Sequence, residues 1–287
     1  RRFGLSELAI GLTVVAAGTS TPELAVSVDA AVKGLGNIAV ANLLGSNIYN
    51  LAFILGVVSF VRVIPVAESL VRRDGVVMLA STAAVGIALL DARISRLDGL
   101  LLASALVAYT AYLLRVEGGN TPTTHSGGDD DPLTRTAPPS FRGWDALRLV
   151  GGLGLVLVSG DSMVLAASAL ARGAGISEWV IGGTIVAAGT STPEFVVSLV
   201  ALKRGSFGVS VGNVVGSNVY NITGILGVAA LVRPLTTTAA ALSTLAWLAG
   251  VSVLMVAALW SRGELSRLEG GLFALSEMVR WALGLLR

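Results

Sequence analysis

The chain contains one long segment twice. Residues 11–50 and 182–221 align without a gap at an offset of 171, and 22 of the 40 aligned positions are identical. GLTVVAAGTSTPE in the first copy matches GGTIVAAGTSTPE in the second, and NLLGSNIYN matches NVVGSNVYN. Identity this dense indicates an internal duplication, so both halves of the chain should build the same unit.

The composition makes lipid the solvent of that unit. Hydrophobic residues are 54% of the chain, charged residues are 13%, and the mean hydropathy is +0.79, whereas a soluble chain carries about 25% charged residues. Nine apolar runs are long enough to cross a hydrocarbon layer of about 30 Å. They cover residues 6–33, 38–61, 74–91, 97–115, 146–171, 177–203, 208–232, 239–260 and 267–286. The runs lack strict alternation and lipid excludes open sheets, so we expect an all-α membrane protein.

The order of the runs predicts an inverted repeat. Five runs separate the start of the first copy from the start of the second, so the second copy enters the membrane from the opposite side. In such folds the substrate site lies near the bilayer midplane. Residues 117–143 are polar, acidic and rich in Pro and Gly, and we interpret them as a linker between a first half at 1–116 and a second half at 144–287.

The positive charges predict an orientation in the membrane. Lys and Arg number 13 on the face that carries the linker and 7 on the other face. The positive-inside rule therefore places the linker and the N-terminus in the cytoplasm, with the chain in the cell membrane. The net charge of +2 gives no sign of a nucleic-acid partner, and the absence of cysteine excludes thiolate metal sites.

Each copy carries a proline and a carboxylate in the middle of an apolar run. Pro22 and Pro193 remove an N–H from a helix, which leaves the carbonyls of Gly18 and Gly189 without their helical partners. Free carbonyls at membrane depth are tolerated where they line a wet cavity. The ionisable group directly after each proline, a glutamate, is expensive in lipid and usually faces a partner or a pathway.

Oxygen atoms of three kinds therefore gather within one or two turns of each copy. The candidate ligands of this segment are Thr19, Ser20 and Glu23, with Thr190, Ser191 and Glu194 in the second copy. Hard cations prefer such an all-oxygen set, with several ligands at about 2.3–2.6 Å for calcium. One proline kink with hydroxyl residues is common in membrane helices, but two glutamates at equivalent positions of an inverted repeat favour a cation site.

The second helix of each copy adds further polar residues. Ser46 and Asn50 lie four residues apart and share one helix face, as do Ser217 and Asn221. Small residues before them, Gly45 and Gly216, should let helices approach closely. Four more asparagines have two open interpretations, site lining or packing and capping: Asn42, Asn47, Asn213 and Asn218.

The doubled pattern GTSTPE followed by GSNxYN resembles the α-repeats of the sodium/calcium exchanger branch of the cation/calcium antiporters. The resemblance implies a five-plus-five helix layout, a transporter rather than an enzyme, no cofactor, and Ca²⁺ and Na⁺ as the substrates. Calcium would be held by the carboxylates of Glu23 and Glu194 and the carbonyls of Thr19 and Thr190. Sodium sites would add residues around these, with Asn50 and Asn221 at the centre: Ser20, Ser46, Ala187, Ser191 and Ser217.

One departure from some relatives bears on the coupling ions. Potassium-dependent members of the resembling family have Asp where this chain has Asn221. With two carboxylates the site neutralises one Ca²⁺, so we expect potassium-independent exchange, with one net charge moved if three Na⁺ are exchanged. A Ca²⁺/H⁺ exchanger and a cation channel using the same oxygens as a filter are the alternatives. An intramembrane enzyme is disfavoured because no histidine lies in any apolar run.

Two expectations concern the rest of the chain. Asp161 lies within an apolar run and needs a partner, either as a gating group or as a simple helix contact. The run at 146–171 precedes the second copy, and its counterpart at the offset of 171 would end just before Arg1. We therefore expect nine membrane helices here and one further apolar segment upstream, which would complete the five-plus-five layout.

Overall fold

The computed structural model describes residues 6–118 and 143–285, and it is almost entirely helical. The predicted linker lies almost wholly outside the described residues. The first half runs through α1 (Glu7–Ile10), η1 (Gly11–Val15), α2 (Ala16–Thr19), α3 (Thr21–Lys33), α4 (Gly36–Ile48), η2 (Tyr49–Ile54), α5 (Leu55–Val61), β1 (Ile64–Pro65), η3 (Leu70–Gly75), α6 (Val76–Ala88), η4 (Leu89–Asp91), β2 (Arg93–Ile94) and α7 (Arg96–Gly118).

The second half repeats this order after a long helix, α8 (Gly143–Ala174). Its elements are α9 (Glu178–Ile181), η6 (Gly182–Val186), α10 (Ala187–Thr190), α11 (Thr192–Lys203), α12 (Phe207–Val219), η7 (Tyr220–Ile225), α13 (Leu226–Val232), β3 (Leu235–Thr236), α14 (Ala240–Arg262), β4 (Glu264–Leu265) and α15 (Arg267–Leu285). The duplication seen in 40 residues of sequence therefore extends through the whole of each half.

The helices cover all nine predicted apolar runs. By length and composition, five of them could cross a membrane, and seven could do so if each bent pair counts as one span. The bent pairs are Glu7–Thr19 with Thr21–Lys33, at 46°, and Glu178–Thr190 with Thr192–Lys203, at 42°. The other two runs form α8 and α15. The all-α membrane fold is confirmed, while the count of nine spans stays a prediction.

Two short β-ladders tie one half to the other. β1 pairs antiparallel with β4, and β2 pairs antiparallel with β3. β1 and β3 are equivalent at the offset of 171, as are β2 and β4, so each ladder joins a strand of one half to a strand of the other. Each ladder also joins two loops that the predicted topology places on the same face of the membrane.

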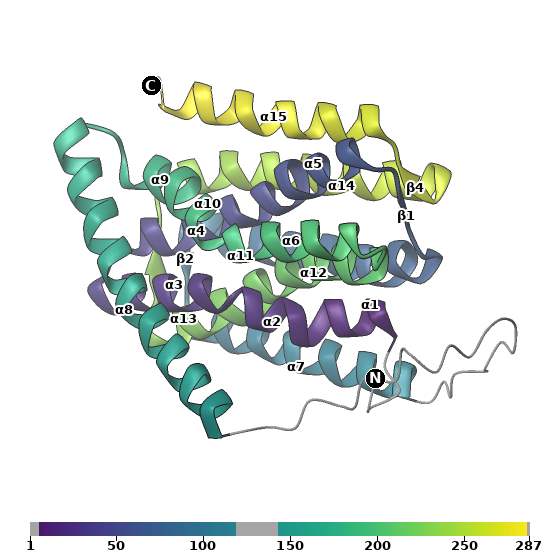
Figure 1. Cartoon of the computed structure of the whole chain (residues 1–287). Coiled ribbons are helices and arrows are strands. Elements are labelled where there is room, and N and C mark those ends of the chain that lie inside the picture. The colour runs from purple at the N-terminus through teal and green to yellow at the C-terminus, as the bar shows by residue number, and fades with distance from the viewer. Residues whose placement is uncertain (1–5, 119–142, 286–287) are drawn as a thin grey trace, which may run out of the picture.

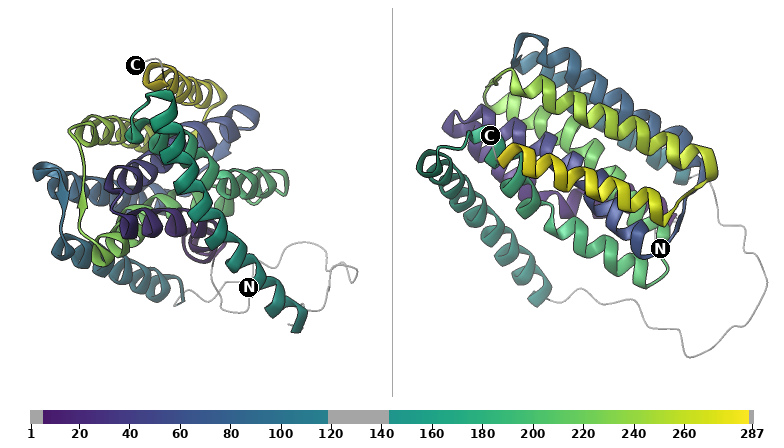
Figure 2. Two further views of the ribbon diagram at one scale, coloured as in Figure 1. Left: turned by 90° about the vertical axis from the view of Figure 1, so that its left-hand side faces the viewer. Right: turned by 90° about the horizontal axis from the view of Figure 1, so that it is seen from above.

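The most buried of the five straight spans are Gly36–Val61 and Phe207–Val232, which carry the second polar motif of each copy. Figure 1 shows them inside the bundle, while α8 and α15 lie at its periphery. Both views in Figure 2 also place α8 on the outside, where it packs against α3. Each site helix is thus shielded from lipid by other helices.

Glycines bring the two halves into backbone contact, as the sequence predicted for Gly45 and Gly216. A Cβ atom on Gly45 would lie 2.5 Å from the carbonyl oxygen of Gly183, and one on Gly216 would lie 2.6 Å from that of Leu12. Leu12 and Gly183 are equivalent at the offset of 171, so the same crossing occurs twice. The residue after each of these glycines, Ser46 or Ser217, is held against the other repeat.

We predict that Gly45→Ala lowers the thermal unfolding temperature of the purified protein in detergent. The added methyl group meets backbone atoms of Gly183 that cannot rotate away, and overpacking of this kind costs about 1–3 kcal/mol. Gly250→Ala is the matched control, because nothing lies within 4 Å of a Cβ atom on Gly250 of α14. Equal unfolding temperatures for Gly45→Ala and Gly250→Ala would contradict this account of the crossing.

Candidate cation site

The bend in each repeat lies within its GTSTPE segment. Ser20 and Ser191 separate the two parts of the bent helices, with ψ values of 12° and 7° that interrupt the regular helix. Pro22 and Pro193 lie in the first turn of the following helices, where a missing N–H is tolerated. The Gly18 carbonyl is not free, because it accepts a hydrogen bond from the Thr21 hydroxyl at 2.9 Å.

The two bends cross, and each glutamate is bound by the other repeat. The Ser20 hydroxyl donates to Oε1 of Glu194 at 2.9 Å, and the Ser191 hydroxyl donates to Oε1 of Glu23 at 2.9 Å. All four side chains are fully buried. The reciprocal pair places both carboxylates at the contact between the repeats, as the inverted duplication predicted.

Hydroxyls of the second motif lie beside the first motif of the opposite repeat. The Ser46 oxygen lies 3.4 Å from the Thr190 hydroxyl and 3.4 Å from the Ala187 carbonyl oxygen. Ser217 lies 3.5 Å from the Thr19 hydroxyl and donates to Oε1 of Glu194 at 3.3 Å. The structure therefore brings predicted hydroxyl groups of both repeats and the Ala187 carbonyl into one buried cluster.

Four asparagines form a closed amide network at the centre. Asn47 and Asn218 each donate to the other's backbone carbonyl, at 3.0 and 3.1 Å. Their side-chain oxygens accept from Nδ2 of Asn221 and Nδ2 of Asn50 respectively, both at 3.0 Å. Asn50 and Asn221 lie in the π-helical turns η2 and η7, a geometry that is frequent at functional sites.

The network gives each of these four amide nitrogens a hydrogen bond and leaves some acceptor oxygens without one. Among the described residues, four buried oxygens of this cluster have no hydrogen-bond partner: Oε2 of Glu23, Oε2 of Glu194, Oδ1 of Asn50 and Oδ1 of Asn221. An unsatisfied buried polar atom costs about 1–3 kcal/mol, and more when it is charged. Two carboxylate and two amide oxygens left open together suit a hard cation, which wants only oxygen ligands.

The cluster holds two acids and no third. Within residues 6–118 and 143–285, no three histidine, cysteine or acidic side chains gather around a common point. Two carboxylates balance the charge of one divalent cation, and the remaining oxygens are neutral. All eleven predicted site residues are buried in the structure.

Comparison with known proteins agrees with this geometry. The sodium/calcium exchanger protein family model matches residues 1–115 and 144–276. The chain belongs to this family. Inner membrane protein YrbG of Escherichia coli is 34% identical over 82% of this chain and 72% of its own length. Sodium/calcium exchanger MaX1 of Methanosarcina acetivorans is 30% identical over 94% of this chain and 86% of its own.

A solved structure is similar along nearly the whole chain. The sodium-calcium exchanger NCX_Mj, soaked with 2.5 mM Na⁺ and 0.1 mM Ca²⁺, matches with a TM-score of 0.72 and 29% identity, over 98% of this chain and 88% of that one. The inverted-repeat antiporter fold is thereby confirmed. The protein is an integral membrane member of the cation/calcium antiporters.

The four asparagines whose role the sequence left open all contact residues of the candidate site. Asn47 and Asn218 belong to the amide network described above. Asn42 accepts from the Thr190 hydroxyl at 3.2 Å, and Asn213 accepts from the Thr19 hydroxyl at 3.0 Å. Their Nδ2 atoms donate to Ser27 and Ser198. These residues position the candidate ligands, and their equivalence at the offset of 171 was the signal that could have identified them.

Asp161 finds a partner outside the site. Lys33 bridges Asp161 and Asp29, with 2.6 Å between its Nζ atom and Oδ2 of Asp29. The Asp161 side chain is 53% exposed, and it joins α8 to α3. Of the two interpretations of Asp161, the observed contact is the helix partner.

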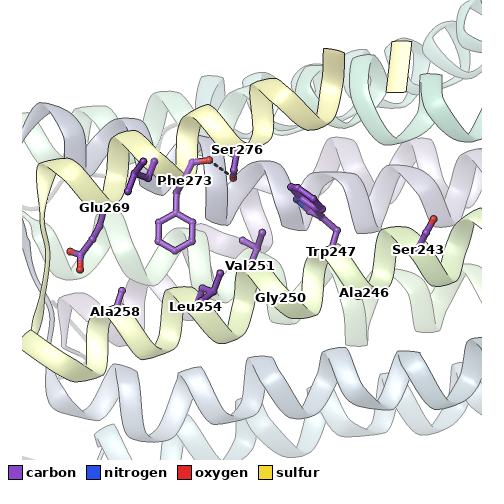
Figure 3. A pocket seen from close by; sticks show the side chains of 11 residues that line it. Ser243, Ala246, Trp247, Gly250, Val251, Leu254, Ala258, Glu269, Phe273 and Ser276 are labelled. Carbon is purple, nitrogen blue, oxygen red and sulfur yellow. Dashed lines mark hydrogen bonds between the residues drawn. The ribbon is translucent and has the colours of Figure 1, made fainter. Parts of the chain in front are cut away.

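One large cavity lies apart from the predicted site residues. A cavity of about 720 Å³ lies between α14 and α15, lined mainly by apolar side chains such as Val251, Leu254 and Phe273 (Figure 3). None of the eleven predicted site residues lines it. This mainly apolar lining offers a cation few oxygen ligands.

We predict that Asn47→Ala destabilises the antiporter and disorders Asn221. The change removes the acceptor of Asn221 and the donor to the Asn218 carbonyl, and each buried group left unpaired costs about 1–3 kcal/mol. Asn37→Ala is the control, since Asn37 makes one exposed bond, to Thr238. A smaller loss of unfolding temperature for Asn47→Ala than for Asn37→Ala would refute the network's role.

Proposed function

We propose that this antiporter exchanges Na⁺ for Ca²⁺ by alternating access. The observation that carries the proposal is the set of four buried oxygens without partners, two of them carboxylate, at the contact of the two repeats. Two buried carboxylates would repel an anion, whereas a cation meets four open acceptor oxygens. The names of MaX1 and NCX_Mj, both sodium/calcium exchangers, support the choice of substrates.

The ligand assignment follows the repeats. Ca²⁺ takes the carboxylates of Glu23 and Glu194 and the carbonyls of Thr19 and Thr190. Na⁺ takes the surrounding oxygens, with Asn50 and Asn221 at the centre: Ser20, Ser46, Ala187, Ser191 and Ser217. The same carboxylates serve both ions, so the two substrates compete and one must leave before the other binds.

The two bent helices are suited to alternating access. They are equivalent at the offset of 171, and the inverted topology opens one toward each face of the membrane. When one bent helix moves about its bend at Ser20 or Ser191, the hydrogen bond from that serine to the glutamate of the other repeat must change. Cation binding replaces the contact, which links occupancy of the site to closure. Such a device is a transporter rather than an enzyme or an open channel.

The two carboxylates and the neutral Asn221 determine which ions are exchanged and how many. One Ca²⁺ cancels both carboxylates, whereas three Na⁺ leave the loaded site with one positive charge. An amide cannot bind a proton or supply the third acid of potassium-dependent relatives, so exchange needs neither H⁺ nor K⁺. The chain sits in the cell membrane with the 117–143 linker, which joins halves 1–116 and 144–287, in the cytoplasm.

We predict that Glu23→Gln and Glu194→Gln each abolish exchange. Wild-type protein in sodium-loaded proteoliposomes should take up radioactive calcium from potassium-free medium, and loss of one carboxylate leaves Ca²⁺ half neutralised. Glu68→Gln is the control, because Glu68 pairs with Arg72 on the surface. Near wild-type uptake by either site variant overturns the ligand assignment, and uptake driven by a proton gradient alone favours Ca²⁺/H⁺ exchange.

We also predict that membrane voltage drives transport. One net charge crossing per cycle is worth about 2.3 kcal/mol per 100 mV. Calcium uptake in exchange for internal Na⁺ should therefore rise when valinomycin and a potassium gradient set the vesicle interior positive. Equal rates at opposite potentials would instead indicate two Na⁺ per Ca²⁺.

A further inference from the structure

A buried charged cluster on α15 lies outside the site and breaks the symmetry of the repeats. Arg280 pairs with Glu277 through two bonds, at 2.7 Å from Nε and 2.6 Å from Nη2, and the Glu277 side chain is 1% exposed. The Trp281 indole N–H donates to Glu277 at 2.7 Å. Burial of an ion pair carries a desolvation cost that the attraction between the charges often does not repay, so this pair is a candidate for a functional role.

The cluster contacts η6 of the second repeat through a backbone carbonyl. Nη2 of Arg280 donates to the Gly183 oxygen at 2.9 Å. Gly183 lies in η6, one turn before Ala187, whose carbonyl oxygen faces Ser46. The Gly183 backbone also forms the crossing with Gly45, so a shift of Gly183 is transmitted to Ser46 as well.

The same cluster contacts η2 of the first repeat through stacked aromatic rings. The Trp281 ring stacks on Tyr49, with 5.9 Å between centroids. Tyr49 directly precedes Asn50 in η2. One cluster on α15 therefore contacts both η6, which leads to Ala187 in the second repeat, and η2, which contains Asn50 in the first repeat.

The equivalent place in the first half is built differently. At the offset of 171, Leu106, Tyr109 and Thr110 stand where α15 has Glu277, Arg280 and Trp281. The Tyr109 hydroxyl donates at 2.9 Å to Asp74, which pairs with Arg73 of η3. At the place of Arg280, α7 therefore contributes a neutral tyrosine, and the charged residues beside it come from η3.

We propose that the Glu277–Arg280–Trp281 cluster is a positioning device that sets the Na⁺ affinity of the oxygens around Ser46 and Ala187. These oxygens are neutral, so they bind a cation well only when backbone and side chain are held at the right separation. Ca²⁺ depends chiefly on the two carboxylates, which the cluster does not touch. The inference rests on the proposed exchange of Na⁺ for Ca²⁺.

The test uses a double variant that keeps the local charge neutral. Glu277→Gln with Arg280→Gln removes both charges together, so no unpaired ion is left buried. Purified variants in proteoliposomes are assayed for Na⁺-driven Ca²⁺ release and for sodium-free Ca²⁺/Ca²⁺ exchange. The half-saturating Na⁺ concentration should rise about fivefold, the lower end of usual coupling between sites, while half-saturating Ca²⁺ in the sodium-free assay stays within about twofold.

Two further variants make the result specific. Arg280→Lys keeps a paired charge but cannot bind the carboxylate in two places and reach Gly183 as well, so it should raise half-saturating Na⁺ about twofold. This variant decides the matter if the double variant does not fold. Tyr109→Phe is the mirror control and should leave the half-saturating Na⁺ concentration unchanged.

Each contrary outcome has a distinct meaning. A parallel rise for Na⁺ and Ca²⁺, no rise in Arg280→Lys, or an equal rise in Tyr109→Phe overturns the positioning role. Wild-type protein that carries out Ca²⁺/Ca²⁺ exchange but ignores Na⁺ would instead overturn the proposed coupling. The failure of the inference and that of the proposed function are thus separable.

Discussion

The reciprocal hydrogen bonds between serine and glutamate are the constraint on which the rest of the site depends. A buried carboxylate needs hydrogen-bond donors, and each glutamate accepts a bond from a serine of the other repeat. Ser20 donates to Glu194, and Ser191 donates to Glu23. Each glutamate therefore accepts its shortest side-chain hydrogen bond from the opposite half. The pairing of the halves thus also assembles the candidate cation site.

Close backbone approach makes that pairing possible. The glycine crossings at Gly45 and Gly216 place Ser46 and Ser217 within reach of the opposite bend. The amide network then orients Asn50 and Asn221 through one hydrogen bond from each Nδ2 atom, and their Oδ1 atoms are left without a partner. Together with the two open carboxylate oxygens, these acceptors fit the cation site that we propose.

Departures from symmetry are as informative as the symmetry itself. The ladders, bends and crossings recur at the offset of 171, but Arg280 and Tyr109 occupy equivalent places with different chemistry. The two halves therefore differ in the side chains that pack behind equivalent segments of the candidate site.

The sequence by itself determined the helical membrane fold, the inverted duplication and the two motifs, because hydropathy, run length and repeat identity are local properties. It also indicated which residues could be ligands, since Glu, Ser and Asn are costly in lipid and seldom recur at equivalent positions without a shared role. It could not decide the roles of Asn47 and Asn218, or the partner of Asp161. Those depend on which side chains from distant segments meet, and that is set by the crossing of the two halves. Only the tertiary structure therefore showed which oxygens were already paired and which remained open.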